Sequence, residues 1–329
     1  MNALYSLGAV ILLIGIAMVG AGSAGLEPIF GVLIPYLALA VFIAGIVFRV
    51  VKWARAPVPF RIPTTCGQQK SLPWIKASIL ESPSNTAGVL ARMALEILAF
   101  RSLFRNTKLG LKNQKLYYGD NQFLWLGALA FHYSFLVILL RHFRFFTEPV
   151  VPFVGVLQSL DGFLQIGVPG LYLTDVVILL ALTYLFSRRV LSPTLRYISL
   201  PSDYFALFLI LAVAGSGVLM RYFTKVDVKT IKELAMGLAS LHPVVPKGIG
   251  LVFYVHLFLV SALIAYFPFS KLVHMAGVFL SPTRNLANNN RMVRHLNPWN
   301  YPVKVHTYEE WEDDFRDKMK AAGLPLEKE

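Results

Sequence analysis

The chain has 329 residues, of which 56% are hydrophobic and 15% are charged, and its formal net charge is +13 at pH 7. This composition is typical of a polytopic membrane protein, in which surplus positive charge gathers in loops on one side of the bilayer, so it does not indicate nucleic-acid binding. The single cysteine, Cys66, excludes an internal disulfide, a cysteine-ligated iron–sulfur cluster and a CxxCH site for covalent haem attachment.

Six apolar segments are long enough to cross a hydrocarbon core, which takes about 20 helical residues. The first lacks the basic N-terminal region of a cleaved signal peptide, so we expect it to be retained as a membrane helix. The last is long, and we expect Pro268 to kink it. The sequence therefore predicts an all-α bundle of six transmembrane helices. The spans are residues 3–24, 28–50, 121–145, 169–187, 203–222 and 249–280.

The charges of the connecting loops predict the orientation of the bundle. Loop 51–120 carries eleven Lys or Arg residues and loop 188–202 carries three, whereas loops 22–27 and 146–168 carry none. The positive-inside rule therefore puts both termini and the two basic loops in the cytoplasm. Loop 223–248 disagrees, because it carries four lysines on the predicted outer side.

Two segments of the predicted cytoplasmic regions have helical patterns. Residues 86–104 are too interrupted for a span, so we expect this helix to dock a partner or to lie on the membrane. Residues 307–322 begin with acids and end with lysines, which complements a helix dipole and suits either a solvated tail or a docking helix. The predicted domains are two N-terminal transmembrane helices (1–50), a basic cytoplasmic loop (51–120), a four-helix core (121–280) and a cytoplasmic tail (281–329).

Four of the seven histidines lie on two of the predicted spans. His132 and His142 are on the third span, and His256 and His274 are on the sixth. A membrane histidine can be a hydrogen-bonded packing residue, but ionisable groups inside membranes are commonly functional. Histidine is also the axial ligand of b-type haem, and a six-coordinate haem takes two, so the four predict two haem groups. We read the other histidines as ordinary polar surface; they are His242, His295 and His306.

The spacing of these histidines predicts how they pair. The third and sixth spans are antiparallel, so matching depth pairs His142 with His256 near the outside and His132 with His274 near the cytoplasm. Ten helical residues rise roughly 15 Å and eighteen rise roughly 27 Å, so a haem must tilt or a helix must bend. Eighteen residues are five complete turns, which would point His256 and His274 in the same direction.

Cations near the histidines suit the propionate groups of haem. Arg141 and Arg144 lie at the outer end of the third span, and Lys271 lies near His274. Each of these side chains is equally compatible with snorkelling to the membrane surface.

The histidine spacing, ten residues on one span and eighteen on the last, resembles the gamma-subunit family of respiratory nitrate reductases, which are di-haem b, quinol-oxidising membrane cytochromes. In that family the first histidine of one helix pairs with the last of the other. The chain departs from it by an additional N-terminal span and a long loop. Segments 66–108 and 297–325 instead resemble the DsrM family, the membrane cytochromes of the sulfite-reduction-associated complex. This resemblance extends over nearly the whole chain.

This second resemblance implies a place in dissimilatory sulfate or sulfite reduction, in the cytoplasmic membrane of a prokaryote. It implies menaquinol or menaquinone as one redox partner and a cytoplasmic iron–sulfur subunit as the other, DsrK-like and similar to heterodisulfide reductase. It also implies further membrane and periplasmic subunits, and the small sulfur-carrying protein DsrC as the final cytoplasmic acceptor. A nitrate reductase gamma subunit and a heterodisulfide reductase cytochrome b subunit are the alternatives within the same class.

With these partners, we expect menaquinol to be oxidised near the outer haem and electrons to leave from the inner one. Asp175, about two turns into the fourth span, is the first candidate for a quinone-binding group, with Tyr172 and Arg141 after it. Asp175 can equally be an interfacial cap, and a quinone site on the inner side stays open. Two other functions remain alternatives, a proton-relay transporter, although no repeated half-structure supports it, and a structural anchor without haem.

Overall fold

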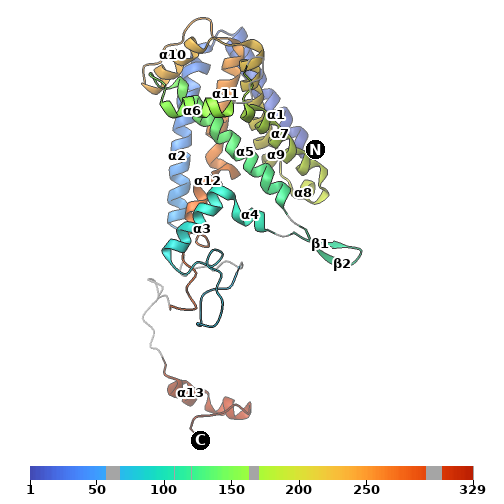
Figure 1. Ribbon diagram of the computed structural model, residues 1–329, viewed down its shortest axis with the longest axis vertical. Helices are drawn as coiled ribbons and strands as arrows, with labels where there is room; N and C mark the ends of the chain where they lie inside the picture. Colours follow the sequence, from blue (N-terminus) through green and yellow to red (C-terminus); the bar gives the residue numbers. More distant parts are fainter. Residues whose placement is uncertain (57–66, 107, 120, 163–169, 294–305, 329) are drawn as a thin grey trace. The chain divides into compact units, whose positions relative to one another are not determined.

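The computed structural model describes most of the chain, and most of that part is helical (Figure 1). The described residues fall into two units, Met1–Ala56 with Leu90–Asn285, and Pro57–Val89 with Leu286–Glu329. Cys66 and His295 lie outside the described residues. The described ranges are 1–56, 67–106, 108–119, 121–162, 170–293 and 306–328.

Five helical segments of the described ranges are long and apolar enough to cross a membrane, and they confirm five of the six predicted spans. The segments are Asn2–Ser23, Ile29–Ala54, Gln122–Phe145, Pro201–Thr224 and Leu251–Phe269. Their α-helical parts are α1 (Asn2–Ala17), α2 (Ile34–Ala54), α5 (Gln122–Arg141), α9 (Pro201–Val218) and α11 (Leu251–Tyr266).

The remaining predicted span, 169–187, coincides with helix α7 (Leu173–Leu191). Its 19 residues include Asp175, Arg188 and Arg189, which make it more polar than the other five. Because α7 packs against both α5 and α9, it belongs to the same bundle as they do. The helix is therefore confirmed, while its crossing of the membrane stays a prediction.

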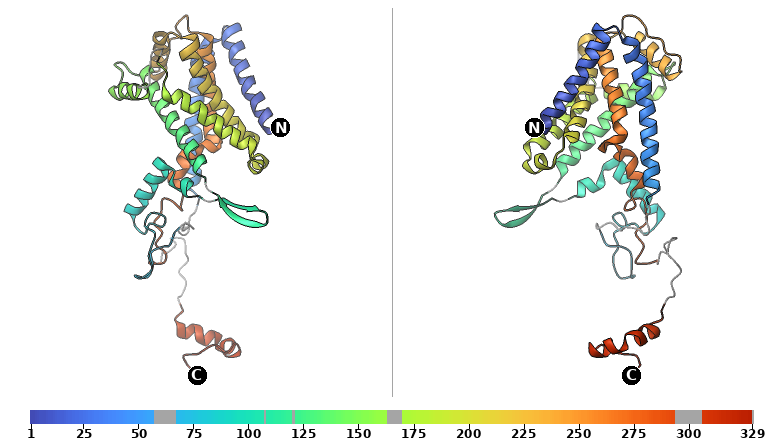
Figure 2. Two further views of the ribbon diagram at one scale, coloured as in Figure 1. Left: turned by 45° about the vertical axis from the view of Figure 1, so that its right-hand side comes forward. Right: turned by 180° about the vertical axis from the view of Figure 1, so that it is seen from behind.

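The bundle is held together by apolar side chains where its helices meet. Helix α5 packs on α7, α1 packs on α9, and α11 packs on α2 and α9. Leu182 of α7, Leu209 of α9 and Leu259 of α11 are fully buried at these contacts. Figures 1 and 2 show α11 between its neighbours from three sides. The outward faces carry exposed apolar side chains such as Ile43, as expected of a surface that lipid covers.

The sixth predicted span is broken before it reaches His274. Helix α11 ends at Tyr266, a short 3-10 turn covers Phe267–Phe269, and Ser270 is extended, with ψ 178°. Pro268 lies at the break, as predicted, because proline cannot donate the backbone hydrogen bond that would continue an α-helix. His256 and His274 are thus not five turns apart on one helix, and the expectation that they point the same way from a common axis was wrong. The bend supplies what the unequal histidine spacing required.

The segment between the second and third spans contains two helices and a hairpin. Helix α3 (Thr86–Ala99) confirms most of the helix predicted at 86–104, and α4 (Arg101–Arg105) follows it after Phe100, whose φ is +48°. An antiparallel hairpin of β1 (Lys108–Lys112) and β2 (Lys115–Gly119) was not predicted, and its two-residue turn is typical of twisted hairpins. Further helices are α6 (Pro152–Asp161), α8 (Pro193–Ile198), α10 (Val228–Ala239) and α12 (His274–Gly277).

The C-terminal helix α13 (Tyr308–Ala321) confirms the helix predicted at 307–322. Its first turn is a capping box, because the Thr307 hydroxyl accepts the backbone N–H of Glu310 at 3.2 Å and the Glu310 carboxylate accepts the N–H of Thr307 at 3.1 Å.

Candidate functional site

The four span histidines come together as two pairs. The ring centres of His142 and His256 are 6.5 Å apart and their planes differ by 11°. The ring centres of His132 and His274 are 6.1 Å apart and their planes are nearly perpendicular, at 83°. These are the two pairs that matching the depths of the antiparallel spans predicts.

Three of the four histidine rings bind the same kind of partner. In each, Nδ1 lies beside a backbone carbonyl oxygen three or four residues earlier in the chain. A carbonyl oxygen can only accept, so each Nδ1 carries the proton and each Nε2 keeps its lone pair. This is the arrangement that metal-ligating histidines usually have. The Nδ1 atoms of His132, His142 and His274 lie 2.7, 2.7 and 2.8 Å from the carbonyl oxygens of Ala128, Ile138 and Lys271.

His256 reaches the same state through a side chain of another helix. Its Nδ1 lies 2.9 Å from the hydroxyl oxygen of Ser216 on α9. The Ser216 hydroxyl donates its own proton to the carbonyl of Val213, at 3.0 Å, so its oxygen accepts from His256. All four histidines therefore hold Nε2 ready to bind a metal ion.

The distances within the pairs fit a metal ion between two imidazoles. An imidazole nitrogen binds a metal at about 2 Å, and the ring centre lies about 1 Å further, so two axial imidazoles have their centres roughly 6 Å apart. Within the described ranges, no group of three or more His, Cys, Asp or Glu side chains could hold a metal ion. Two histidines supply two ligands, so the residues present suit a metal whose other ligands come from a macrocycle, as in haem.

Aromatic side chains surround the His132–His274 pair. Phe100 and Phe131 lie 5.0 and 4.9 Å from the His132 ring, both edge-on. The end of α3 is fixed to α5 at this point, because Trp125 Nε1 donates to the carbonyl of Ala99 at 2.7 Å. The left-handed backbone of Phe100, which is costly for a bulky residue, turns its ring toward the histidine and marks a constrained position.

The three cations predicted for haem propionates differ in their partners. Arg141 and Lys271 are both in ion pairs, Lys271 with Asp203 at 2.7 Å. Arg144 has no carboxylate within 4 Å in the part of the chain that the structure describes, and lies over the ring of Phe145. Arg144 is therefore the cation whose charge is most available to an anion.

Arg141 belongs to a buried charged cluster that includes all three predicted quinone-site residues. It binds Asp161 at 3.0 Å and Asp175 at 2.7 Å, and it is 8% exposed. The ring of Tyr172 is sandwiched between Arg141, 3.8 Å from the ring centre, and Arg221, at 3.9 Å. Two arginines and two aspartates make the cluster neutral overall, which limits the cost of burying it.

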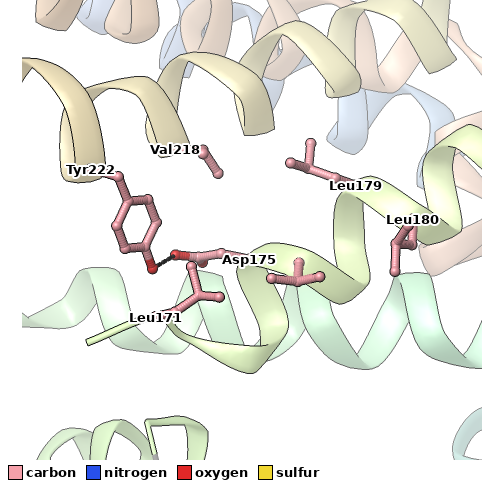
Figure 3. A pocket seen from close by; sticks show the side chains of 7 residues that line it. Leu171, Asp175, Leu179, Leu180, Val218 and Tyr222 are labelled. Carbon is pink, nitrogen blue, oxygen red and sulfur yellow. Dashed lines mark hydrogen bonds between the residues drawn. The ribbon is translucent and has the colours of Figure 1, made fainter. Parts of the chain in front are cut away.

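One side of this cluster lines a small cavity of about 230 Å³. Figure 3 shows the Tyr222 hydroxyl pointing at Asp175 at one end, with leucine and valine side chains around the rest. Tyr222 donates to Asp175 at 2.8 Å. The surface of the cavity is apolar, and the polar atoms of Asp175 and Tyr222 are turned toward each other at its edge. The lining residues are Leu171, Asp175, Val176, Leu179, Leu180, Val218 and Tyr222.

Sequence reasoning missed several residues of these sites, including Arg221, which stacks on Tyr172. Ser216, Asp161 and Tyr222 lie far in sequence from the groups they bind, so no local spacing marks them. Asp161 offers one weak signal, since its position in an otherwise apolar stretch of α6 suggests a buried partner.

Comparisons with known proteins agree with this geometry. The nitrate reductase gamma subunit family matches residues 79–295. A curated protein of Archaeoglobus fulgidus, described as an Hdr-like menaquinol oxidoreductase cytochrome b-like subunit, is 48% identical over 278 residues, which are 82% of this chain and 83% of that protein. A protein of Archaeoglobus profundus with the same description is 43% identical over 277 residues, 81% of each chain.

Proposed function

Since this chain belongs to the nitrate reductase gamma subunit family, we propose that it is a membrane cytochrome b subunit that takes electrons from menaquinol and passes them to a partner protein. The observation that carries the proposal is the two imidazole pairs, with ring centres 6.5 and 6.1 Å apart, in one bundle of apolar helices. We name menaquinol as the electron donor because the relatives are described as subunits of a menaquinol oxidoreductase.

In this proposal His142 and His256 hold one haem b, and His132 and His274 hold the other. Each haem, when bound, supplies reversible one-electron chemistry between the quinol and the partner. The chain's own part is to present each Nε2 to the iron and to keep each ring in one tautomer and orientation through Nδ1. Arg144 is the first candidate to bind a haem propionate, because Arg141 and Lys271 already form ion pairs with aspartates.

The quinol headgroup binds in the cavity beside Asp175. Arg141, which holds Asp175, is followed directly by His142, so this cavity is tied to the His142–His256 pair. Oxidation of a quinol releases two electrons and two protons, so the site must also accept protons. The Asp175 carboxylate is the base at the edge of the cavity, and Tyr222, which already donates to it, passes on a proton from a quinol oxygen. A cavity of about 230 Å³ suits a two-ring headgroup, while the isoprenoid chain extends into lipid.

Electrons leave from the His132–His274 pair toward the cytoplasm. This follows from the basic loop 51–120 and the positive-inside rule, which put that end of α5 and both termini on the cytoplasmic side of the inner membrane. The acceptor is an iron–sulfur subunit similar to heterodisulfide reductase, DsrK-like, in a larger complex of the DsrM type that serves sulfate or sulfite reduction. The Hdr-like description of the relatives supports such a partner.

The test is direct reduction by quinol. The purified membrane complex, reconstituted in lipid nanodiscs and oxidised, is mixed with a reduced menaquinone analogue while its visible spectrum is followed. We expect bands of reduced b-type haem to appear without any other reductant. A preparation whose haem is reduced by dithionite but not by menaquinol or ubiquinol analogues would contradict a quinol-linked role.

A further inference from the structure

Ser216 makes a contact that sets His256 apart from the other three histidines. His132, His142 and His274 hold Nδ1 with carbonyls of their own local backbone. His256 instead donates to a side chain 40 residues earlier, on the neighbouring helix α9. The acceptor at this one position is therefore set by a side chain, and a single substitution can remove it.

The other acceptor near the His256 ring is the backbone carbonyl of Val213, which already accepts the Ser216 hydroxyl at 3.0 Å. Ser216 lines a cavity of about 390 Å³ between α1, α9 and α11 whose other walls are apolar or glycine. Ile14 and Met18 come from the first span, and Leu251 and Val255 come from α11. The apolar side chains that line this cavity offer no hydrogen bond to His256. The position after Ser216, Gly217, lies so close that an added Cβ would contact the His256 ring at 3.5 Å.

We propose that Ser216 is a positioning residue that fixes the tautomer and orientation of His256 and lowers the reduction potential of the metal that His256 ligates. The proposal rests on the proposed function, since it takes His256 as an axial haem ligand. An acceptor on Nδ1 pulls the N–H proton and makes the imidazole a stronger electron donor through Nε2. A stronger donor favours the ferric state, so loss of the acceptor raises the potential.

The test is a spectroelectrochemical titration of the intact membrane complex, with three variants at this position. In Ser216→Ala, which removes the hydroxyl and leaves His256 only the more distant carbonyl of Val213, we expect one of the two haem midpoints to shift upward while the other stays. In Ser216→Cys, which keeps the volume but has a weak acceptor, we expect a smaller shift of the same midpoint. In Ser216→Thr, which keeps the hydroxyl and has room for its methyl in the cavity, we expect the wild-type value.

The matched control is Ser261→Ala on α11. Ser261 is a serine of the same bundle, more deeply buried than the half-buried Ser216, and it donates to the carbonyl of Leu257. Within the described residues, no hydrogen bond joins it to a histidine. It should leave both midpoints unchanged, and the low-spin ferric signals in electron paramagnetic resonance should change in Ser216→Ala only.

Two results would overturn the inference. If Ser216→Ala and Ser216→Cys bind both haems and leave both midpoints at their wild-type values, Ser216 does not act through His256, while the proposed function stands. If the wild-type complex contains no b-type haem, the proposed function fails first and the inference fails with it.

Discussion

The protonation state of the four histidines is set by four separate contacts in four different settings. His132 lies inside α5, His142 begins a 3-10 turn, His256 lies inside α11, and His274 begins α12. In each setting Nδ1 has an oxygen partner between 2.7 and 2.9 Å away. A packing role requires no such uniformity, whereas metal ligation requires a free Nε2 at every position. These four contacts therefore favour metal ligation by the histidines over a role in packing alone.

Asp175 is the residue whose replacement tests the quinol site. Asp175→Asn keeps the size of the side chain, but it cannot accept a proton. Its one oxygen can still accept from Arg141, and its NH₂ group can donate to the hydroxyl oxygen of Tyr222. Loss of a general base costs typically about 10²- to 10⁴-fold, so we expect quinol-dependent haem reduction to slow by about a hundredfold or more. Stopped-flow spectroscopy with a menaquinol analogue measures it. Asp227→Asn, at the start of α10, is the control and should reduce at the wild-type rate.

Replacing Arg141 should destabilise the fold far more than replacing Arg144, although the two residues are only three apart. Arg141→Ala leaves Asp161 and Asp175 buried without their common counter-ion, and breaking a buried pair costs about 3–5 kcal/mol. Arg144→Ala breaks no ion pair of the described residues, so we expect a change below about 1 kcal/mol. Unfolding in mixed micelles, followed by circular dichroism, compares the two. Equal stability of both variants would show that the buried cluster does not stabilise the fold.

The break after α11 determines where His274 lies relative to His132. A continuous helix would carry residue 274 further along the axis of α11, whereas the turn at Pro268 and the extended Ser270 bring it back against His132. The carbonyl of Pro268 also accepts a hydrogen bond from Arg49 Nε of α2 at 3.0 Å, which fixes the turn to a neighbouring span. The break thus determines the position of His274, because a straight helix would carry it five complete turns beyond His256.

Pro268→Ala tests this dependence. Alanine permits the α-helix to extend past Tyr266, so we expect the variant to lose part of its His132–His274 haem and to keep the other. Haem content per chain, from the pyridine haemochrome spectrum, measures the loss. Pro201→Ala, at the first turn of α9, should retain both haems. Full occupancy in Pro268→Ala would mean that the contacts of the turn Lys271–Val273 and of α12 hold His274 without the proline.

The sequence predicted those elements whose signal is local. Hydropathy located the spans, and the histidine spacing on antiparallel spans identified the two pairs. The kink at Pro268 was predicted, but the hairpin and the extended backbone of Ser270 were not, because short irregular segments carry little periodicity. Asp161, Ser216 and Tyr222 were not predicted either, since their partners are brought near only by packing. A serine in an apolar helix looks the same in sequence whether it bonds its own backbone, as Ser261 does, or a histidine on another helix, as Ser216 does.

At the scale of the whole molecule, orientation decides where electrons enter and leave. One loop opposed the charge rule, and its structure offers a partial reason. Within loop 223–248, Lys232 pairs with Glu148 of the preceding outer loop, which removes one of its four positive charges. The distribution of the remaining charge still predicts that the basic 51–120 segment and the C-terminal tail lie on one side of the membrane.

Cysteine labelling in cells tests that orientation. In a Cys66→Ser background, we expect Lys229→Cys on α10 to react with a membrane-impermeant maleimide added outside intact cells or spheroplasts. Lys115→Cys, in the hairpin, should react only after the membrane is opened. Labelling of position 115 from outside would reverse the topology and would place the His132–His274 pair on the outer side.

The measurement that tests the central claim most directly is the haem content of single histidine variants of the purified complex. We predict two b-type haems per chain in the wild type, and one in each of His142→Ala, His256→Ala, His132→Ala and His274→Ala. The haem that remains should have the same midpoint and spectrum in the first two variants, and the other haem should remain in the last two. A folded wild-type protein without haem, or loss of different haems in His142→Ala and His256→Ala, would contradict the account.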